Sequence, residues 1–83
     1  MFEPAIARAA RAYTGLSQKL LGEAAGVAKR TVFRLEKNGK VEKRSLDRIL
    51  SAFERLGVVM LHGERGAVRG MEFRPRRAGG DSR

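Results

Sequence analysis

Basic side chains gather in the middle of this chain. Residues 29–48 hold eight Lys or Arg and three Asp or Glu, a net charge of +5 in a chain whose total is +9. Lys and Arg donate hydrogen bonds to phosphate oxygens and, in the major groove of DNA, to the O6 and N7 atoms of guanine. A solvated helix face usually mixes both signs of charge, so this clustering indicates contact with a polyanion.

If this basic segment is helical, most of its basic side chains lie on one face of the helix. At 100° per residue, Val32 and Leu35 point to one side. The opposite face carries Arg30, Phe33, Arg34 and Lys37, with Lys29 at its flank. Phe33 is an aromatic residue on an otherwise basic surface, and two interpretations stay open: contact with a thymine methyl group, or packing against the neighbouring helix or hairpin.

Four helical segments are expected to position that face. The spacing of their apolar residues and the Pro, Ser and Gly residues at their ends predict them. They run from Pro4 to Gly15, from Ser17 to Gly26, from Val27 to about Asn38, and from Ser45 to Gly57. Ser17 and Ser45 are the expected N-caps of the second and fourth helices. The inward stripe of the second helix is expected to be Leu20, Leu21, Ala24 and Ala25, and that of the fourth Leu46, Ile49, Leu50, Phe53 and Leu56.

The pattern changes after Gly57 to two short runs rich in strand formers, with His62 to Gly66 between them. Residues 58–73 therefore predict a β-hairpin, and Gly70 predicts a bulge or a close approach in its second strand. An isolated hairpin is marginal in water, so it must pack on the helices or pair with a second copy of the chain. Residues 74–83 are basic and nearly free of apolar side chains, which predicts a disordered tail after a domain spanning residues 1–73.

The stretch GLSQKLLGEAAGVAKRTVFRLEKNG, from Gly15 to Gly39, resembles the helix-turn-helix of the Cro/C1-type, or XRE, transcription regulators of bacteria and phages. The resemblance covers residues 4–56 and implies a mainly α, lambda-repressor-like fold of about four helices, here followed by the hairpin. Two positions depart from the family. A small residue is needed in the second helix where the third crosses it. Gly22 stands there in place of the usual Ala, which weakens the second helix by about 1 kcal/mol. Ala28 stands where Ser or Thr usually caps the third helix, at a similar cost of about 1 kcal/mol.

The resemblance also implies roles for single residues. Lys29, Arg30 and Arg34 match positions that touch base edges, and Phe33 lies on the same surface. Gln18 matches a glutamine that bonds a backbone phosphate and braces the third helix. Arg11 and Glu36 match a partly buried ion pair. Further candidates for phosphate contact are Lys19, Thr31, Lys37, Asn38, Lys40, Lys43 and Arg44.

Other chemistry finds little support in the composition. Cys is absent, so disulfides and thiolate metal sites are excluded. His62 has no second histidine or carboxylate cluster beside it, so a turn residue is expected there in place of a metal ligand or a base. The hydroxyls of Ser17, Ser45 and Ser51 lack a base at a recognisable spacing. We therefore expect no enzyme activity, no metal and no cofactor.

The length sets further bounds. A chain of 83 residues is expected to form one domain, with no room for a module that senses a small-molecule effector. The longest run of bulky apolar residues, Val58 to Leu61, is far shorter than the roughly 20 residues that cross a bilayer, so no membrane partner is expected.

Together these features predict a cytoplasmic, sequence-specific transcription regulator that binds a two-fold DNA operator as a homodimer and acts most simply as a repressor. One alternative is the antitoxin of a toxin–antitoxin pair, in which the hairpin or tail grips a toxin; copurification with a second small protein would distinguish it. Another is a non-specific, nucleoid-type protein that binds phosphates alone. Competition with random DNA over a salt series separates that case.

Overall fold

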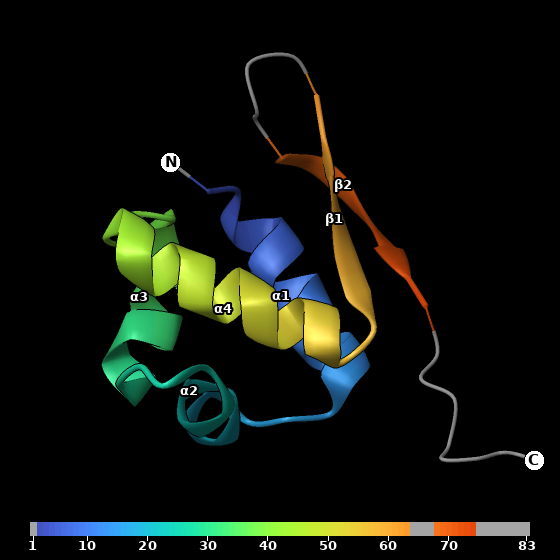
Figure 1. Ribbon diagram of the computed structural model, residues 1–83. Coiled ribbons are helices and arrows are strands. Elements are labelled where there is room, and N and C mark those ends of the chain that lie inside the picture. The colour runs from blue at the N-terminus through green and yellow to red at the C-terminus, as the bar shows by residue number, and fades with distance from the viewer. Residues whose placement is uncertain (1, 64–67, 75–83) are drawn as a thin grey trace, which may run out of the picture.

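The chain forms four helices followed by a two-stranded antiparallel hairpin (Figure 1). The computed structural model describes residues 2–63 and 68–74. Its elements are α1 (Pro4–Thr14), α2 (Gln18–Ala25), α3 (Lys29–Asn38), α4 (Lys43–Arg55), β1 (Val58–His62) and β2 (Val68–Phe73). The expected mainly helical fold with a C-terminal hairpin is confirmed. The predicted tail lies outside the described residues from residue 75 onward, as does Ala67 at the expected start of the second strand.

The helix ends follow local signals in most places. Helices α1, α2 and α3 each end at a glycine with positive φ, and Gly26 is the one that turns the chain from α2 into α3. The Ser17 hydroxyl accepts a hydrogen bond from the Leu20 N–H at 3.1 Å, so Ser17 is the N-cap of α2 as expected.

Two predicted helix starts and one predicted turn residue were wrong. Helix α4 begins at Lys43 after an extended Glu42, so Ser45 lies inside the first turn and is not the N-cap. Its end agrees with the prediction, since Gly57 has positive φ directly after the C-cap Leu56. Helix α3 begins at Lys29 and not at Val27, because the Val27 N–H donates to the Gly22 carbonyl and Ala28 is extended. His62 is the last residue of β1, paired with Val68, and not part of the turn.

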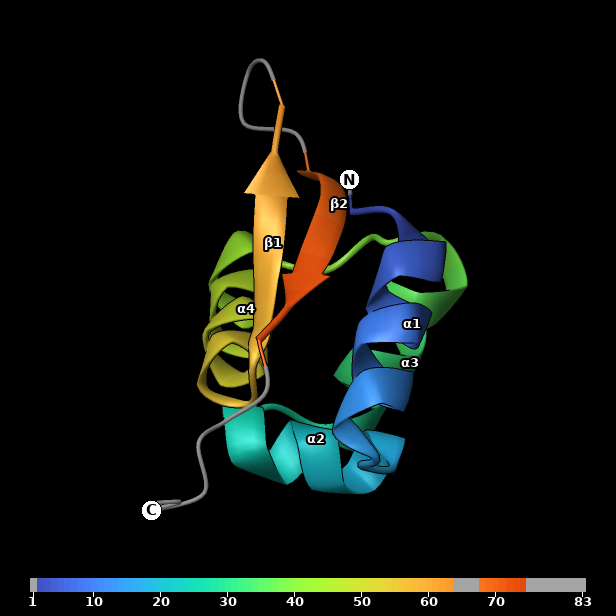
Figure 2. The same ribbon diagram turned by 90° about the vertical axis from the view of Figure 1, so that its right-hand side faces the viewer.

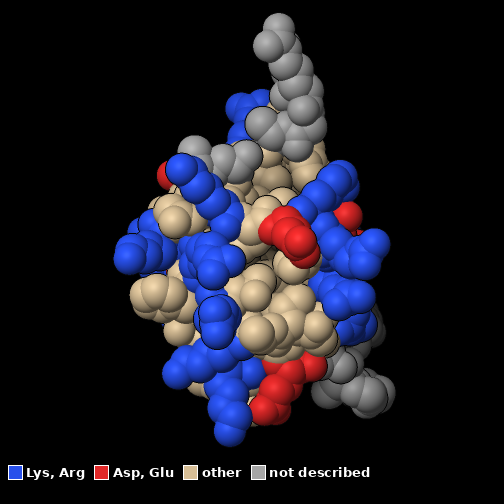
Figure 3. Space-filling view, turned by 90° about the vertical axis from the view of Figure 1, so that its left-hand side faces the viewer, with Lys and Arg blue, Asp and Glu red and all other residues tan. Residues whose placement is uncertain are grey.

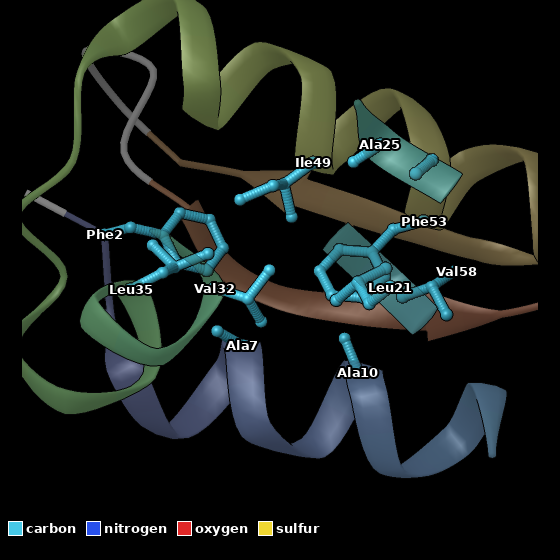
Figure 4. Close-up of a cluster of buried hydrophobic side chains, with 11 residues drawn as sticks. Phe2, Ala7, Ala10, Leu21, Ala25, Val32, Leu35, Ile49, Phe53 and Val58 are labelled. Carbon is cyan, nitrogen blue, oxygen red and sulfur yellow. The ribbon is translucent and has the colours of Figure 1, made fainter. Parts of the chain in front are cut away.

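The core lies where the helices meet the base of the hairpin. Figure 4 shows Ala7 and Ala10 of α1 pointing toward the side chains of α2, α3 and α4, which include Leu21, Val32 and Phe53. The expected stripe of α2 was half wrong: Leu20 is 49% exposed and Ala24 is exposed, whereas Gly22 is buried. The inward residues of α2 are Gln18, Leu21, Gly22 and Ala25, at i, i+3, i+4 and i+7. A polar residue and a glycine therefore occupy half of this stripe.

The hairpin packs on the helices with one face. Figures 1 and 2 show β1 beside α4 and β2 on the side of α1. The Phe73 ring stacks on Tyr13 of α1 at 4.2 Å between centroids, and the Arg74 N–H donates to the Gly57 carbonyl. The strand register shifts between Leu61, opposite Gly70, and His62, opposite Val68, so the predicted irregularity is present. A close approach is not its cause, since a Cβ on Gly70 would meet only the tip of Leu61, at 3.9 Å.

Candidate nucleic-acid interface

Helix α3 is held against α2 by a close backbone crossing. A Cβ at Gly22 would lie 2.8 Å from the Val27 carbonyl oxygen, closer than such atoms approach, and the Val27 N–H donates to the Gly22 carbonyl at 2.9 Å. Gly22 therefore lets the α2–α3 turn sit directly on α2. A small residue was expected at this crossing, and the observed geometry is tighter still, since it has no room even for the methyl group of Ala.

A buried ion pair ties α3 to α1. The Glu36 side chain is 5% exposed, and its carboxylate accepts hydrogen bonds from Arg11 Nε at 2.6 Å and from Arg11 Nη2 at 3.1 Å. These are the two residues that the resemblance pairs. The hydrogen bond to Glu36 raises the pKa of the Arg11 guanidinium, although partial burial opposes the shift. Glu36 is thus engaged with a permanent cation and acts as a brace.

Gln18 joins the same carboxylate from α2. Its Nε2 donates to Glu36 Oε1 at 3.1 Å, while Arg11 Nη1 also donates to the Leu16 carbonyl. The bracing role expected for Gln18 is therefore visible in the geometry. One carboxylate of α3 holds side chains from α1 and α2, which fixes the position of α3 relative to both helices.

Arg8 adds a contact that the sequence analysis missed. Its Nη1 donates to the Glu36 backbone carbonyl at 2.6 Å, so α1 grips α3 through two arginines. Arg8 precedes Arg11 by three positions, and residues at this spacing lie on the same side of a helix. That spacing was the signal available in the sequence.

The proposed base-reading residues all lie on the opposite, outward side of α3. Lys29, Arg30, Phe33 and Arg34 are exposed, and the side chains of the three cations make no hydrogen bond or ion pair to any described residue. Figure 3 shows the surface around α3 and the start of α4, where Lys and Arg line both margins and acidic side chains occupy a small part. The structure thus brings free cations together on one rigid helix.

Phe33 is half exposed and lies outside the buried core. Its ring is 50% exposed, and it is missing both from the buried cluster and from the partly buried residues around it. The ammonium group of Lys37 lies 5.8 Å from the ring centroid, within the range of a cation–π contact. Because half of the ring surface is covered within the protein, both interpretations of Phe33 stay predictions.

The phosphate candidates differ in their environments. Asn38 Oδ1 accepts from the Lys40 N–H at 2.8 Å, which leaves the Asn38 amide N–H groups for an external acceptor. Lys43 forms an exposed ion pair with Asp47 at 3.1 Å, so a phosphate would compete with that carboxylate. Thr31 is half-buried. The remaining candidates, Lys19, Lys40 and Arg44, are exposed, and their side chains have no polar partner in the part of the chain that is described.

Two arginines of α4 serve the fold. Arg55 Nη2 donates to the Ala24 carbonyl at 2.8 Å, and Arg48 Nη1 donates to the Gly26 carbonyl at 3.4 Å. Both acceptors lie at the C-terminal end of α2, where helix carbonyls lack partners and attract positive charge. The sequence analysis missed these roles, because the contacts span 22 and 31 positions of the chain.

The described residues were also compared with the requirements of a metal site, a pocket and a membrane span. No three His, Cys, Asp or Glu side chains converge to hold a metal ion within residues 2–63 and 68–74. An open groove of about 310 Å³ lies between α4 and β1, with Asp47, Ser51, Glu54 and His62 among the residues that line it. No helix in the described ranges is long and apolar enough to cross a bilayer.

No model of a known protein family and no curated protein matches this chain. The features that bear on function are therefore the braced α3 and the exposed cations on its outer side, which have no hydrogen bond or ion pair with a described residue.

Proposed function

We propose that this protein is a sequence-specific DNA-binding regulator of transcription with the lambda-repressor-like fold of the Cro/C1-type family. One observation carries the proposal. Helix α3 is anchored on its inner side by Arg8, Arg11 and Gln18. On its outer side, the side chains of Lys29, Arg30 and Arg34 have no hydrogen bond or ion pair with a described residue. A rigid helix with donors on its outward face is what direct reading of the major groove requires.

In this proposal Lys29, Arg30 and Arg34 donate to base edges. Each bidentate contact between an arginine and guanine discriminates by about 1 to 3 kcal/mol. Lys19, Lys40 and Arg44, with the amide of Asn38, donate to phosphates and set the position of the protein along the duplex. Gln18 keeps its bracing bond while its second amide hydrogen faces the backbone.

The protein is proposed to bind as a homodimer joined through the hairpin. Leu61 of β1 is 45% exposed, and Gly70, its partner on β2, has no side chain to cover it. A second copy would cover this apolar side chain. Two copies related by a two-fold axis would place their α3 helices in successive major grooves, about 34 Å apart.

Footprinting on the DNA that flanks the protein's own gene tests the proposal. We expect a symmetric protected site that survives an excess of random duplex. Arg34→Ala should lower affinity for that site by about 10-fold or more and leave random-duplex binding nearly unchanged, because it removes a base contact. Lys40→Ala should weaken both similarly and reduce the salt dependence by about one unit in the slope of log K against log salt.

Equal losses on specific and random DNA for Arg34→Ala would contradict the base-reading role. If an excess of random duplex abolishes binding to the site at every salt concentration, the protein is a non-specific DNA-binding protein.

A further inference from the structure

Phe33 is an aromatic side chain that lies outside the buried core. Val32 and Leu35, its neighbours on α3, are fully buried and supply the apolar contacts of the helix. Phe33 stays half exposed and contributes nothing to the core. Among the described residues it is the large apolar side chain that α3 exposes. The exposed half of the ring is therefore open to a surface that meets α3 from outside.

The side chains around Phe33 restrict what that surface can be. Arg30 precedes it by three positions and Lys37 follows it by four, so both flank the ring on the helix surface. Lys37 also lies 5.8 Å from the ring centroid, a contact that favours one orientation of the ring. An apolar protein surface docked here would have to bury these cations without partners, which is costly. A polyanion with an apolar feature between its charged groups fits the arrangement.

The major groove of DNA offers one such feature. A phenyl ring has no hydrogen-bond donor or acceptor, so it cannot read the nitrogen and oxygen atoms of base edges. The apolar group exposed in that groove is the C5 methyl of thymine, which apolar side chains contact. On either side of it, phosphates and guanines are available to the flanking cations.

We propose that Phe33 is a specificity-determining residue that contacts the C5 methyl group of a thymine, with Lys37 holding its ring in place. This inference rests on the proposed function and names the base chemistry that one residue of the interface selects. Burial of a methyl-sized apolar group contributes about fourfold in affinity, which corresponds to about 0.8 kcal/mol. Phe33 should thus favour thymine over a pyrimidine that lacks the methyl group.

Replacement of thymidine by deoxyuridine tests this, because it removes the methyl group and keeps every hydrogen-bonding atom. In the footprinted site, we expect one thymine in each half-site whose replacement weakens wild-type binding about fourfold. In Phe33→Ala the same replacement should have no effect, and Phe33→Leu should keep part of it. Arg34→Ala is the matched control: it weakens binding but should retain the full uracil effect.

The outcomes separate the two proposals. A wild-type protein that protects no specific site overturns both. A wild-type protein that binds its site, with no thymine sensitive to uracil or with the same uracil effect in Phe33→Ala, overturns only the role of Phe33. Phe33→Ala should leave the melting temperature nearly unchanged, since the ring is outside the core. If it instead abolishes association with a copurifying protein and the uracil effect persists, Phe33 serves a protein contact and the inference fails.

Discussion

At the scale of single residues, glycine and arginine decide where α3 lies. Gly22 removes the side chain at the crossing with the α2–α3 turn, and Arg8 and Arg11 reach across from α1 to Glu36. None of these residues needs to touch a ligand to matter for binding. Each sets the position of the surface that carries the exposed cations.

Gly22→Ala should destabilise the fold, although Ala favours a helix by about 1 kcal/mol over Gly. The new methyl group would lie 2.8 Å from a backbone oxygen, so the turn must move. Overpacking costs about 1 to 3 kcal/mol, and we expect a net loss of about 1 kcal/mol in urea denaturation. Ala24→Gly, at an exposed position of the same helix, isolates the propensity difference. A Gly22→Ala protein more stable than wild type would contradict the crossing seen here.

Loss of one partner of the Arg11–Glu36 pair should cost more than loss of both. Arg11→Leu leaves a carboxylate that is 5% exposed without its main partner, at a cost of about 3 kcal/mol, reduced by the remaining bond from Gln18. In Arg11→Leu/Glu36→Leu no charge is left unpaired, and we expect part of that stability to return. A double-mutant cycle in urea measures the coupling. Additive losses would show that the pair contributes nothing as a pair.

At the scale of elements, the hairpin depends on the helices for its order. Two strands alone are marginal in water, and the inner face of this hairpin supplies Val58, Met60 and Met71 to the core or its margin. Its last residue, Phe73, reaches the end of α1. The same α1 holds α3 through its arginines, so one helix carries contacts to both the hairpin and the proposed reading helix.

Phe73→Ala should loosen the hairpin from α1. The Tyr13–Phe73 stack, at 4.2 Å and 14° between ring planes, contributes about 0.5 to 1.5 kcal/mol beyond the area that it buries. We expect faster hydrogen exchange of the β2 amides and a lower melting temperature. Leu20→Ala is the matched control, because Leu20 is similarly exposed, at 49% against 43% for Phe73, but lies on α2 and not on the hairpin. Equal effects of the two changes would remove the anchoring role from the stack.

At the scale of the whole molecule, the basic side chains fall into two groups: those that stabilise the fold and those that are exposed on α3. Arg8, Arg11, Arg48 and Arg55 bond carbonyl or carboxylate oxygens of the fold. The side chains of Lys29, Arg30 and Arg34, on the outer face of α3, have no hydrogen bond or ion pair in the described part of the chain. The total of +9 therefore does not by itself say which cations have donors left to bond an anion. The location of the free cations, more than their number, supports an interface centred on α3.

The proposed dimer gives a prediction at this scale. Leu61→Lys should convert the dimer to a monomer in sedimentation experiments, because it replaces an exposed apolar side chain of the hairpin with a charge, and it should weaken operator binding by about 10-fold or more. Leu20→Lys is the control, since Leu20 is also exposed, at 49%, but lies on α2. A wild-type protein that stays monomeric at every concentration, and on DNA, would contradict the hairpin interface.

The sequence by itself determined the helices in number and nearly in extent, the hairpin, and the outward basic face of α3. These features depend on residues close together in the chain: a proline that starts a helix, glycines that accept positive φ, and apolar spacing at 3.6 residues. The pairing of Arg11 with Glu36 was available only through the resemblance. Where the local signal was a single serine, as at Ser45, the predicted helix start was wrong by a few residues.

Only the tertiary structure decided which cations are free and which brace the fold, which side of α2 faces inward, and that Gly22 sits where no methyl group fits. Each of these depends on contacts between segments many positions apart, such as Arg55 with Ala24 or Arg8 with Glu36. Residue type and spacing record the preference of a side chain for water or for the interior. They do not record which backbone oxygen will lie within reach once the helices have packed.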